Sequence, residues 1–454
     1  MFTRVLIANR GEVAVRVIRA LHELGIEAVA VYSTADEGAL HARLADRAVC
    51  IGPPPAADSY LRIPALIGAA EITRCDAVHP GWGFLAENPA FVRACEENDL
   101  VFVGPTAETM ERMGDKAHAR AELAAAGIPV VPGTDHPTGL DEARELAGEL
   151  GYPVLLKAVA GGGGKGMRRV DSPEELEDAF RRAAAEADAA FASAALYVEK
   201  LVQPARHVEI QVLGDDDGGI LTLGERECSI QRRHQKLIEE SPSPALSGEL
   251  REAMEAAAER AARAIGYRNA GTFEFLIGPE AAFYFIELNA RLQVEHPVTE
   301  LVTGIDLVRA QLRIAAGQAL ELTGRCPRRG HALEARINAE DPARAFAPCP
   351  GRVERFEAPL GAGVRFDTYL EDGATIPPQY DSLLGKLVVW DVDRAAAISR
   401  AVRALRELVV DGVPTTRALA IDVLRSEDFG DGRYSTAYLE HAAARLPALA
   451  EAEA

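Results

Sequence analysis

The sequence predicts a mixed fold, with an α/β domain at the N-terminus and α+β structure in the rest of the chain. A strand–helix–strand pattern opens it, over 4–8, 11–24 and 27–33, and this pattern is typical of a parallel βαβ unit. Two alternating segments, 207–236 and 272–289, are typical of antiparallel hairpins. At 454 residues the chain has room for about three domains of about 150 residues.

Further elements are predicted in order along the chain. "VFVGP" (101–105) is expected to be the last strand of the first domain, and 106–130 is expected to be helical. A second block, about 131–203, holds the strand "PVLLKAVA", a glycine-rich loop, the strand "MRRV", a helix over about 173–193 and the strand "LYVEKLV". The 207–236 hairpin is expected to turn at 217–219, and helices are predicted over 247–265 and 394–408, with a mixed β region after Gly330.

Composition excludes several classes of protein. Hydrophobic residues make up 48% and charged residues 26%, as in soluble globular proteins, and the net charge of -20 argues against nucleic-acid or anionic-membrane binding. The six cysteines form no CxxC pair, so neither a zinc ribbon nor a disulfide framework is expected. The first residues, "MFTRVLIANRGE", lack signal-peptide features, and no apolar run reaches 18 residues, so we expect a cytoplasmic protein.

A glycine-rich loop follows the strand that contains Lys157. Gly161 to Gly164 are followed by Lys165 and Gly166, and glycines let backbone N–H groups approach phosphate oxygens closely. The loop is not a P-loop, because Gly166 stands where Ser or Thr would be needed. A flexible hairpin tip is the alternative, but we favour a mobile flap over a nucleotide.

Two carboxylates are predicted to face each other across the second hairpin. If that hairpin is centred near Glu280, Glu274 and Glu287 are equidistant from its midpoint. Like charges directly opposite each other, about 5 Å apart, are destabilising unless a cation lies between them. Oxygen ligands favour Mg²⁺, and Asn289 shares the face. Two solvated glutamates are the alternative, which the flanking aromatic residues Phe273, Phe275, Phe283 and Phe285 make less favourable.

The segment "IELNARLQVEHPVTE" (286–300) places polar groups at every second position. They are Glu287, Asn289, Arg291, Gln293 and Glu295, a set in which carboxylates, amides and a guanidinium alternate with apolar residues. Lysines are scattered elsewhere, at Lys116, Lys157 and Lys236; each alone is more typical of the surface, but lysine is also a point-charge ligand for phosphate.

Seven motifs in order resemble the biotin carboxylase family of the ATP-grasp superfamily over about residues 2–445. They are "HPGWGFLAEN", "GGGGKGM", "RHVEIQV", "ECSIQRRHQK", "FIELNARLQVEHPVTE", "EARINAED" and "YDSLLGK". The resemblance implies an ATP-grasp fold with a Rossmann-like N-terminal domain (1–113), an ATP-grasp domain (114–330, lid about 131–203) and a C-terminal mixed β domain (331–446).

The resemblance also implies an activity. The expected reaction is ATP-dependent carboxylation of biotin on a carrier protein, with bicarbonate as the carbon source and carboxyphosphate as the intermediate. This is the first half-reaction of acetyl-CoA or acyl-CoA carboxylase, in fatty acid biosynthesis. The alternatives are the same component of a pyruvate or other acyl-CoA carboxylase, another ATP-grasp ligase such as half of a carbamoyl-phosphate synthase, and a catalytically dead assembly subunit. The final acyl acceptor stays open.

Site residues follow from the resemblance, position by position. Expected nucleotide contacts are Lys116, Lys157, Gly162, Gly163, Gly164, Glu199, Lys200, Val202, His207, Gln231, His234, Leu276 and Ile286. Glu274, Glu287 and Asn289 match the ligands of Mg²⁺ (or Mn²⁺). Bicarbonate is expected against Arg291, Gln293, the Val294 backbone and Glu295, with Glu295 as base. Lys236 matches a residue between phosphate and bicarbonate, and Arg336 matches the arginine that stabilises the biotin anion.

The chain departs from the family pattern at a few positions. Trp82, on the biotin side, stands where tyrosine is usual, Ala160 replaces a fifth glycine, and Ala362 replaces a bulky aromatic at the dimer contact. Arg16, Arg19 and Glu23 resemble the family's dimer helix, so a homodimer is expected. None of the five methionines precedes a lysine, so we expect the biotin carrier on another polypeptide, together with a separate carboxyltransferase.

Overall fold

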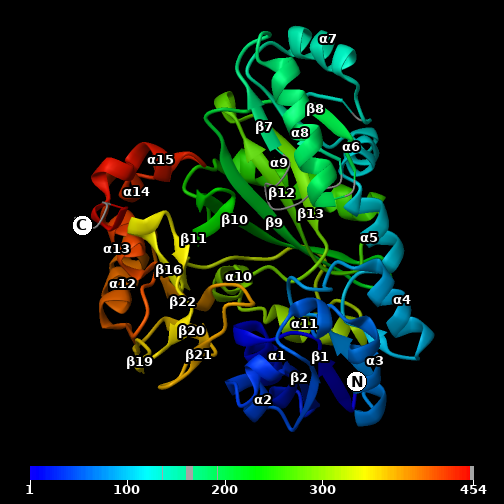
Figure 1. Cartoon of the computed structure of the whole chain (residues 1–454), viewed down its shortest axis with the longest axis vertical. Coiled ribbons are helices and arrows are strands. Elements are labelled where there is room, and N and C mark those ends of the chain that lie inside the picture. Colours follow the sequence, from blue (N-terminus) through cyan, green and yellow to red (C-terminus); the bar gives the residue numbers. More distant parts are fainter. Residues whose placement is uncertain (135, 160–166, 192, 450–454) are drawn as a thin grey trace.

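Three larger sheets, each with helices packed on it, form the framework of the described residues (Figure 1). The computed structural model describes residues 1–134, 136–159, 167–191 and 193–449. All six cysteines are free thiols. Within these ranges, every helix is too short or too polar to cross a bilayer.

The N-terminal sheet confirms the predicted parallel βαβ unit. Its strand order is β3-β2-β1-β4-β5, and every neighbouring pair is parallel. The predicted last strand lies at the edge, and Val5, Leu6 and Ile7 at the centre are buried, as parallel strands require. The elements are β1 (Arg4–Ile7), β2 (Glu27–Ser33), β3 (Arg47–Gly52), β4 (Ala77–His79), β5 (Val101–Phe102), α1 (Gly11–Glu23), α2 (Leu40–Leu44), α3 (Ile63–Thr73) and α4 (Pro89–Glu97).

A small antiparallel sheet stands at the opposite end of the molecule, at the top of Figure 1. Its order is β7-β6-β8, and it has a hydrophobic core of its own with two helices. The helical segment predicted over 106–130 is divided at Asp115, where the backbone is extended. The elements are α5 (Ala107–Gly114), α6 (Lys116–Ala125), α7 (Leu140–Leu150), β6 (Val154–Ala158), β7 (Met167–Val170), α8 (Leu176–Phe191) and β8 (Leu196–Lys200).

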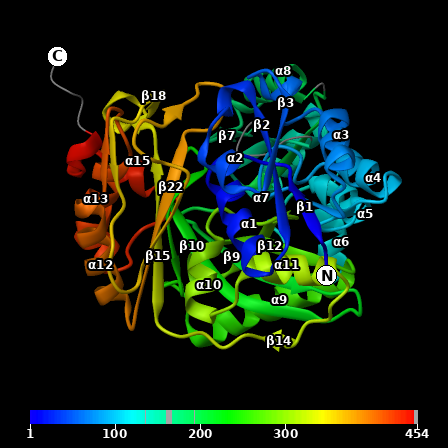
Figure 2. The same ribbon diagram turned by 90° about the horizontal axis from the view of Figure 1, so that it is seen from below.

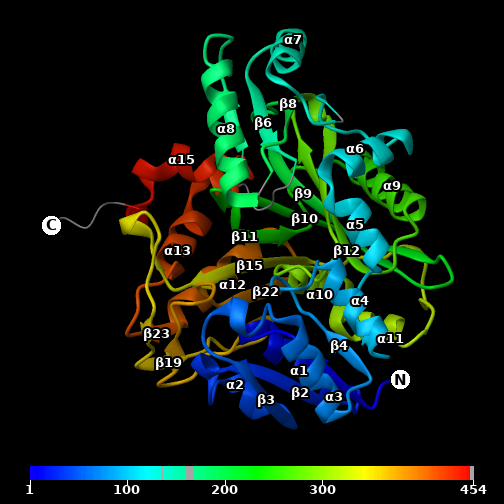
Figure 3. The same cartoon turned by 45° about the vertical axis from the view of Figure 1, so that its right-hand side comes forward.

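One large sheet runs through the middle of the molecule and joins the predicted second and third domains (Figure 3). Its order is β13-β12-β9-β10-β11-β15-β22-β20, with β14 beside β10. The strands are β9 (Arg206–Gly214), β10 (Ile220–Arg232), β11 (Gln235–Ser241), β12 (Asn269–Ile277), β13 (Phe283–Asn289), β14 (Gly324–Arg325), β15 (His331–Asn338), β20 (Val364–Thr368) and β22 (Leu383–Asp391).

The 207–236 hairpin is confirmed in its turn and corrected at its end. β9 and β10 pair antiparallel around 215–219 as predicted. However, β10 ends at Arg232, and Lys236 lies in the next strand, β11. The chain reverses there through Arg233 and His234, whose φ angles are 45° and 67°, and a left-handed turn of this kind closes a tight hairpin.

Helices cover the large sheet on both sides (Figure 2). The predicted helices correspond to α9 (Gly248–Ala264), capped by the Ser247 side chain, and α12 (Arg394–Glu407), capped by Asp393. Five helices in this part of the chain were not predicted: α10 (His296–Thr303), α11 (Leu307–Ala315), α13 (Arg417–Arg425), α14 (Glu427–Gly430) and α15 (Tyr438–Ala442). Nor were α2, α3, α4 and α7 predicted. Short two-stranded ladders complete the fold: β16 (Glu340–Asp341) with β17 (Ala347–Pro348), β18 (Gly351–Arg352) with β21 (Thr375–Ile376), and β19 (Arg355–Glu357) with β23 (Val409–Asp411).

Candidate active site

Alternate residues of the large sheet place a polar row opposite an apolar one. On β9 the polar row is His207, Glu209 and Gln211, and the intervening Val208, Ile210 and Val212 belong to a hydrophobic core. The strand register places Glu209 of β9 beside Glu274 of β12. The same alternation of polar and apolar residues occurs on β15 and β22, whose apolar residues belong to the core under α12 and α13: Leu333, Ala335, Ile337, Leu387 and Val389. Because side chains alternate across a strand, the charged residues collect on one face.

The predicted carboxylate pair is present in the predicted register. Glu274 of β12 lies directly opposite Glu287 of β13, and Thr272 lies opposite Asn289. The register shifts after Glu274, which leaves Ile286 as an extra residue in β13, and bulges of this kind re-aim side chains beside functional sites. Asn289 Nδ2 donates to Glu274 Oε1 at 2.9 Å.

These three residues fit a hard divalent cation. Glu274 is 4% exposed and Asn289 8%, and all the candidate ligand atoms are carboxylate or amide oxygens, which Mg²⁺ and Mn²⁺ prefer. Burial opposes ionisation of Glu274, but Lys236 and His207 outweigh it and hold its pKa well below the usual range. An ionised, buried carboxylate opposite a second glutamate is a suitable cation ligand.

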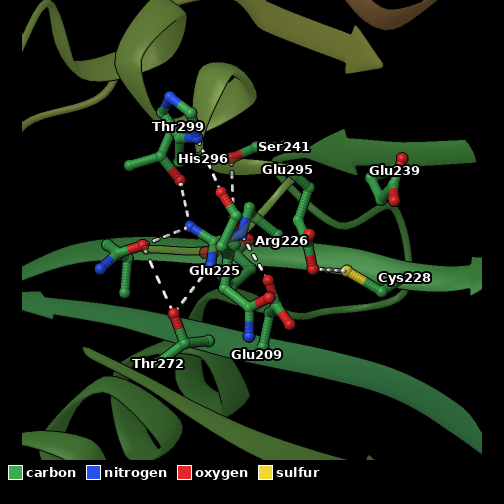
Figure 4. Close-up of polar contacts among 12 residues, drawn as sticks. Glu209, Glu225, Arg226, Cys228, Glu239, Ser241, Thr272, Glu295, His296 and Thr299 are labelled. Carbon is green, nitrogen blue, oxygen red and sulfur yellow. Dashed lines mark hydrogen bonds and ion pairs between the residues drawn. The ribbon is translucent and has the colours of Figure 1, made fainter. Parts of the chain in front are cut away.

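Lys236 connects three buried carboxylates. Its Nζ lies 2.5 Å from Glu209 Oε2, 2.8 Å from Glu274 Oε1 and 2.6 Å from Glu295 Oε1. The carboxylates raise the pKa of Lys236 well above its usual value despite burial, so the ammonium stays charged. Arg226 also contacts this cluster: its Nε lies 2.5 Å from Glu209 Oε1, and the guanidinium donates to Thr272 and Thr299 (Figure 4).

Glu295 lies at the N-cap position of α10, but its side chain does not cap the helix. Its Oε1 pairs with Lys236, and its Oε2 lies 2.9 Å from Arg336 Nη2. Burial favours the neutral acid, yet Lys236, Arg336 and Arg226 hold the pKa of Glu295 well below its usual range. Cys228, whose thiol pKa burial raises, lies beside it at 4.0 Å (Figure 4). Glu295 is therefore a carboxylate able to accept a proton once its cations are engaged elsewhere.

The polar alternation after β13 continues in a turn and not in a strand. β13 ends at Asn289, so the expectation of one continuous polar face over 287–295 holds only to that residue. Arg291 then donates to Asn289 Oδ1 at 2.9 Å, to Gln293 Oε1 at 3.1 Å and to Glu87 Oε2 at 2.8 Å. Gln293 Nε2 reaches Glu274 Oε1 at 3.4 Å. The turn thus carries a guanidinium and an amide beside Glu295.

Arg336 contacts the Glu295 carboxylate from β15, whereas Trp82, after β4, contacts Glu12 of α1. Arg336, on β15, donates to Glu239 Oε1 at 2.6 Å and to Glu295 at 2.9 Å. Burial raises the pKa of Glu239 to about 7, although Arg336 opposes this shift. Trp82 is half-buried, and its Nε1 donates to Glu12 Oε1 at 3.1 Å.

The residues expected to contact the nucleotide lie on two sheets. In the small sheet, Lys157 of β6 pairs with Glu199 of β8 at 2.8 Å, and Lys200 Nζ donates to the Gly151 carbonyl at 2.7 Å. Glu199 also pairs with Arg120. Val202 follows β8 and is half-buried.

In the large sheet, His207 lies 2.9 Å from Glu274 and pairs in register with Leu276, while Gln231 lies near the end of β10. Partial burial, and then the positive charges of His207 and Lys157, lower the pKa of His234, which lies in the turn between β10 and β11. His207 is the one of these two histidines that contacts the hairpin of Glu274 and Glu287 directly, through Glu274.

Some predicted residues lie outside the described part of the chain. They are Gly162, Gly163 and Gly164 of the glycine loop, and Ala160. Lys116 begins α6, but its side chain is likewise outside the description.

Sequence reasoning missed several residues of this cluster. Five buried charged residues in or beside this cluster were not predicted as site residues: Glu12, Glu209, Arg226, Glu239 and Lys386. Glu209 had a visible signal, because it lies between His207 and Gln211 in an alternating strand motif. For the others, only the tertiary contact reveals the role.

Family models match consecutive parts of the chain. Residues 1–110 match "Biotin carboxylase, N-terminal domain", 115–323 match "Carbamoyl-phosphate synthase L chain, ATP binding domain" and 334–441 match "Biotin carboxylase C-terminal domain". The middle model explains why a carbamoyl-phosphate synthase stood among the alternatives. The flanking models are those of biotin carboxylase.

Full-length relatives agree with the flanking models. A biotin carboxylase of Nostoc sp. is 51% identical over 441 residues, covering 97% of this chain and 99% of its own. A Campylobacter jejuni biotin carboxylase in a "beta-gamma-ATP" complex superposes with a TM-score of 0.95 at 46% identity, over 97% and 99% of the two chains.

The structure of the biotin carboxylase domain dimer of Hydrogenobacter thermophilus 2-oxoglutarate carboxylase, in complex with MgADP, ADP and bicarbonate, is also similar. It superposes with a TM-score of 0.94 at 46% sequence identity, and the match covers 97% of this chain and 98% of that one. The sequence identity and the superposition both extend over nearly the whole length of the chain. The chain belongs to the biotin carboxylase family.

Proposed function

We propose that this chain catalyses the ATP-dependent carboxylation of biotin with bicarbonate, and that the biotin arrives on a separate carrier protein. The supporting observation is Glu295, a buried ionised carboxylate fixed between Lys236 and Arg336. It follows the turn that carries Arg291 and Gln293. A base beside cationic and amide donors suits a small planar anion that must lose a proton.

Bicarbonate is proposed to bind against Arg291, Gln293 and the Val294 backbone. The Arg291 guanidinium donates to Glu87 and Asn289 at 2.8 and 2.9 Å, so these contacts orient the donors for which the anion would compete. Glu295 takes the bicarbonate proton. When Lys236 turns to a nucleotide phosphate, the pKa of Glu295 rises because its nearest cation leaves, and the carboxylate becomes a stronger base.

ATP is proposed to lie between the small sheet and the large one. The bicarbonate oxygen attacks the γ-phosphorus, ADP leaves, and the resulting carboxyphosphate breaks into CO₂ and phosphate. Lys236 and Lys157 spread the phosphate charge, while Glu274, Glu287 and Asn289 would hold Mg²⁺ or Mn²⁺. A bound divalent cation supplies charge neutralisation at the nucleotide phosphates.

The remaining nucleotide positions are proposed from their places around this space. Lys157, with Glu199, Lys200 and Val202 on or after β8, would face the base and phosphates from the small sheet. His207, Gln231, His234, Leu276 and Ile286 would line the large-sheet side. Lys116 and Gly162 to Gly164 would cover the phosphates.

Biotin is proposed to meet Arg336. Its guanidinium is shared by Glu239 and Glu295, so it is oriented before substrate arrives. The phosphate product takes the proton of biotin N1′, Arg336 stabilises the negative charge on the ureido oxygen, and the nitrogen then attacks CO₂. Trp82 would border this side of the site.

A direct assay tests the activity. ATP cleavage by the purified chain should require bicarbonate, and it should rise when biotin is added. Ammonia should not replace biotin. Cleavage driven by ammonia would favour the carbamoyl-phosphate alternative, and absence of any bicarbonate-dependent cleavage would favour the inactive-subunit alternative.

The partner proposal has its own test. A biotinylated carrier raises the effective biotin concentration at the site through its tether. We expect weak carboxylation of free biotin and a strong rise when a biotinylated carrier protein is added at far lower biotin concentration. Covalent biotin found on this chain by mass spectrometry would contradict the separate carrier.

A homodimer is supported by the dimeric Hydrogenobacter domain and by the exposed Arg19 and Glu23 of α1. Arg16 is different, because it is buried against Glu300 and Asp306 at 2.8 and 2.7 Å. The acyl acceptor, and thus a role in fatty acid biosynthesis, depends on the carboxyltransferase, because the similar Hydrogenobacter domain belongs to a 2-oxoglutarate carboxylase. Sedimentation of the purified chain tests the dimer.

A further inference from the structure

Lys386 is a buried lysine in the middle of the polar row. It lies on β22 with no exposed surface, directly opposite Arg336 of β15 on one side and Asp367 of β20 on the other. Its neighbours in the strand, such as Leu387, point into the apolar core on the opposite face. Lys386 therefore shares a sheet face with Arg336, and a charge at this depth requires compensation.

Two other regions of the chain contact its ammonium group. Lys386 Nζ donates to the Val294 carbonyl at 2.9 Å and lies 3.2 Å from Glu12 Oε2. Glu12 is 3% exposed in the first turn of α1, and its other oxygen accepts from Trp82 Nε1. Trp82, Glu12, Lys386 and Val294 form a continuous chain from the N-terminal sheet to the turn before Glu295.

That turn depends on side chains for its shape. It runs from the end of β13 at Asn289 to the start of α10 at His296, outside both regular elements. Glu87 holds its beginning by accepting from Ala290 N at 2.9 Å. Lys386 holds its end at the Val294 carbonyl, which belongs to the peptide bond leading into Glu295. Fixing this peptide fixes the direction in which Glu295 leaves the backbone.

We propose that Lys386 is a positioning residue for the bicarbonate turn, and that Glu12, held by Trp82, keeps Lys386 in place. This inference rests on the proposed function, and it adds a second contact from the C-terminal strands to the site, next to that of Arg336. Lys386 touches the turn and not the substrate. Its loss should loosen the turn and weaken bicarbonate binding while leaving the nucleotide side intact.

The test compares Michaelis constants for the two substrates. Lys386→Met should raise the KM for bicarbonate about tenfold or more, because a hydrogen bond from a charged donor is lost, while the KM for ATP changes less than about twofold. Arg394→Met is the matched control. This substitution breaks the ion pair of half-buried Arg394 with buried Glu240, 2.6 Å long and on the opposite face of the same sheet, and it should leave the bicarbonate KM unchanged.

A double variant separates positioning from stability. Lys386→Met alone leaves Glu12 as an uncompensated buried acid, which threatens folding. Glu12→Gln combined with Lys386→Met removes both charges and should regain thermal stability, yet the Val294 carbonyl still lacks its donor and the bicarbonate KM should stay high. A double variant with restored stability and a normal bicarbonate KM would overturn the inference. Wild-type protein that cleaves ATP independently of bicarbonate would instead refute the proposed function, and the inference with it.

Discussion

The large sheet contains two cross-strand pairs of glutamates, and in these pairs the surroundings shift a glutamate pKa in opposite directions. Glu274 faces Glu287 across β12 and β13, and Glu239 faces Glu334 across β11 and β15. Glu274 has its pKa held low because Lys236 and His207 outweigh burial. Glu334 is fully buried, neither of its oxygens has a hydrogen-bond partner, and burial raises its pKa well above the usual range.

The difference shows that glutamates in one sheet can be kept either ionised or protonated by their surroundings. Where cations lie close, the glutamate stays ionised and can bind a metal. Where burial dominates, repulsion between the pair is relieved by a proton, so Glu334 is a neutral acid and Glu239 titrates near neutrality, with a pKa of about 7. Cross-strand repulsion alone therefore does not identify a metal site.

The largest expected effect is at the first pair. Glu287→Gln should lower Mg²⁺-dependent turnover by about a hundredfold or more, because an anionic ligand becomes neutral. Far-ultraviolet circular dichroism should show an intact fold. Unchanged dependence of the rate on Mg²⁺ concentration would show that the pair does not hold the metal.

The next largest effects are expected at Glu295 and Arg336, and substitutions of these two residues should block different steps of the reaction. Glu295→Ala should abolish most bicarbonate-dependent ATP cleavage, a loss of about a hundredfold or more for a missing general base. Arg336→Ala should leave part of that cleavage while biotin carboxylation falls further. Both rates are measured on each variant, and equal losses in both assays would mean that the two roles are not separable.

A smaller effect is expected in the pH dependence of stability. The folded-state pKa of Glu239, about 7, lies above the ordinary glutamate value of 4.5. The folded protein therefore binds this proton more tightly, and the stability contributed is complete below about pH 4.5 and lost as the pH rises through about 7. Glu239→Gln cannot lose a proton, so its free energy of unfolding, measured in urea from pH 5 to 8, should fall less steeply than that of the wild type. If the free energies of unfolding of the two proteins depend on pH in the same way, the folded-state pKa of Glu239 is not near 7.

The smallest effect belongs to Glu334→Gln. This side chain is already neutral, so the amide should change the rate less than about threefold at neutral pH, in contrast to the same substitution at Glu287. The steady-state rate of ATP cleavage is the measurement. A loss comparable to that of Glu287→Gln would mean that Glu334 is ionised and that the contrast between the pairs is wrong.

Local patterns in the sequence predicted most of the framework. The register of Glu274 with Glu287 could be read from the hairpin because a short turn fixes the pairing of its own strands. Glu239 and Glu334 belong to strands distant in the sequence, so their pairing depends on how separate units pack. The seven motifs predicted the family, the fold and the type of reaction, and the comparisons with known proteins confirmed all three.

Other features could not be predicted for physical reasons. Helices α10, α11 and α13 to α15 were missed because short helices depend on tertiary packing more than on their own propensity. Lys386 occurs in a quoted motif, yet nothing local shows that its ammonium reaches a carbonyl far away in the chain. The polar alternation of 287–295 looked like one strand, although the pattern continues through a turn.

The separate core of the small sheet has a consequence for how the molecule opens. Leu156, Val170, Leu176 and Val198 pack among themselves and with their two helices, apart from the core beneath the central strands. Units with separate cores exchange amide hydrogens as separate cooperative groups. Amides of β6 and β8 should therefore exchange through an opening that leaves β9, β12 and β15 protected, so one half of the proposed nucleotide site can detach while the carboxylate cluster keeps its geometry.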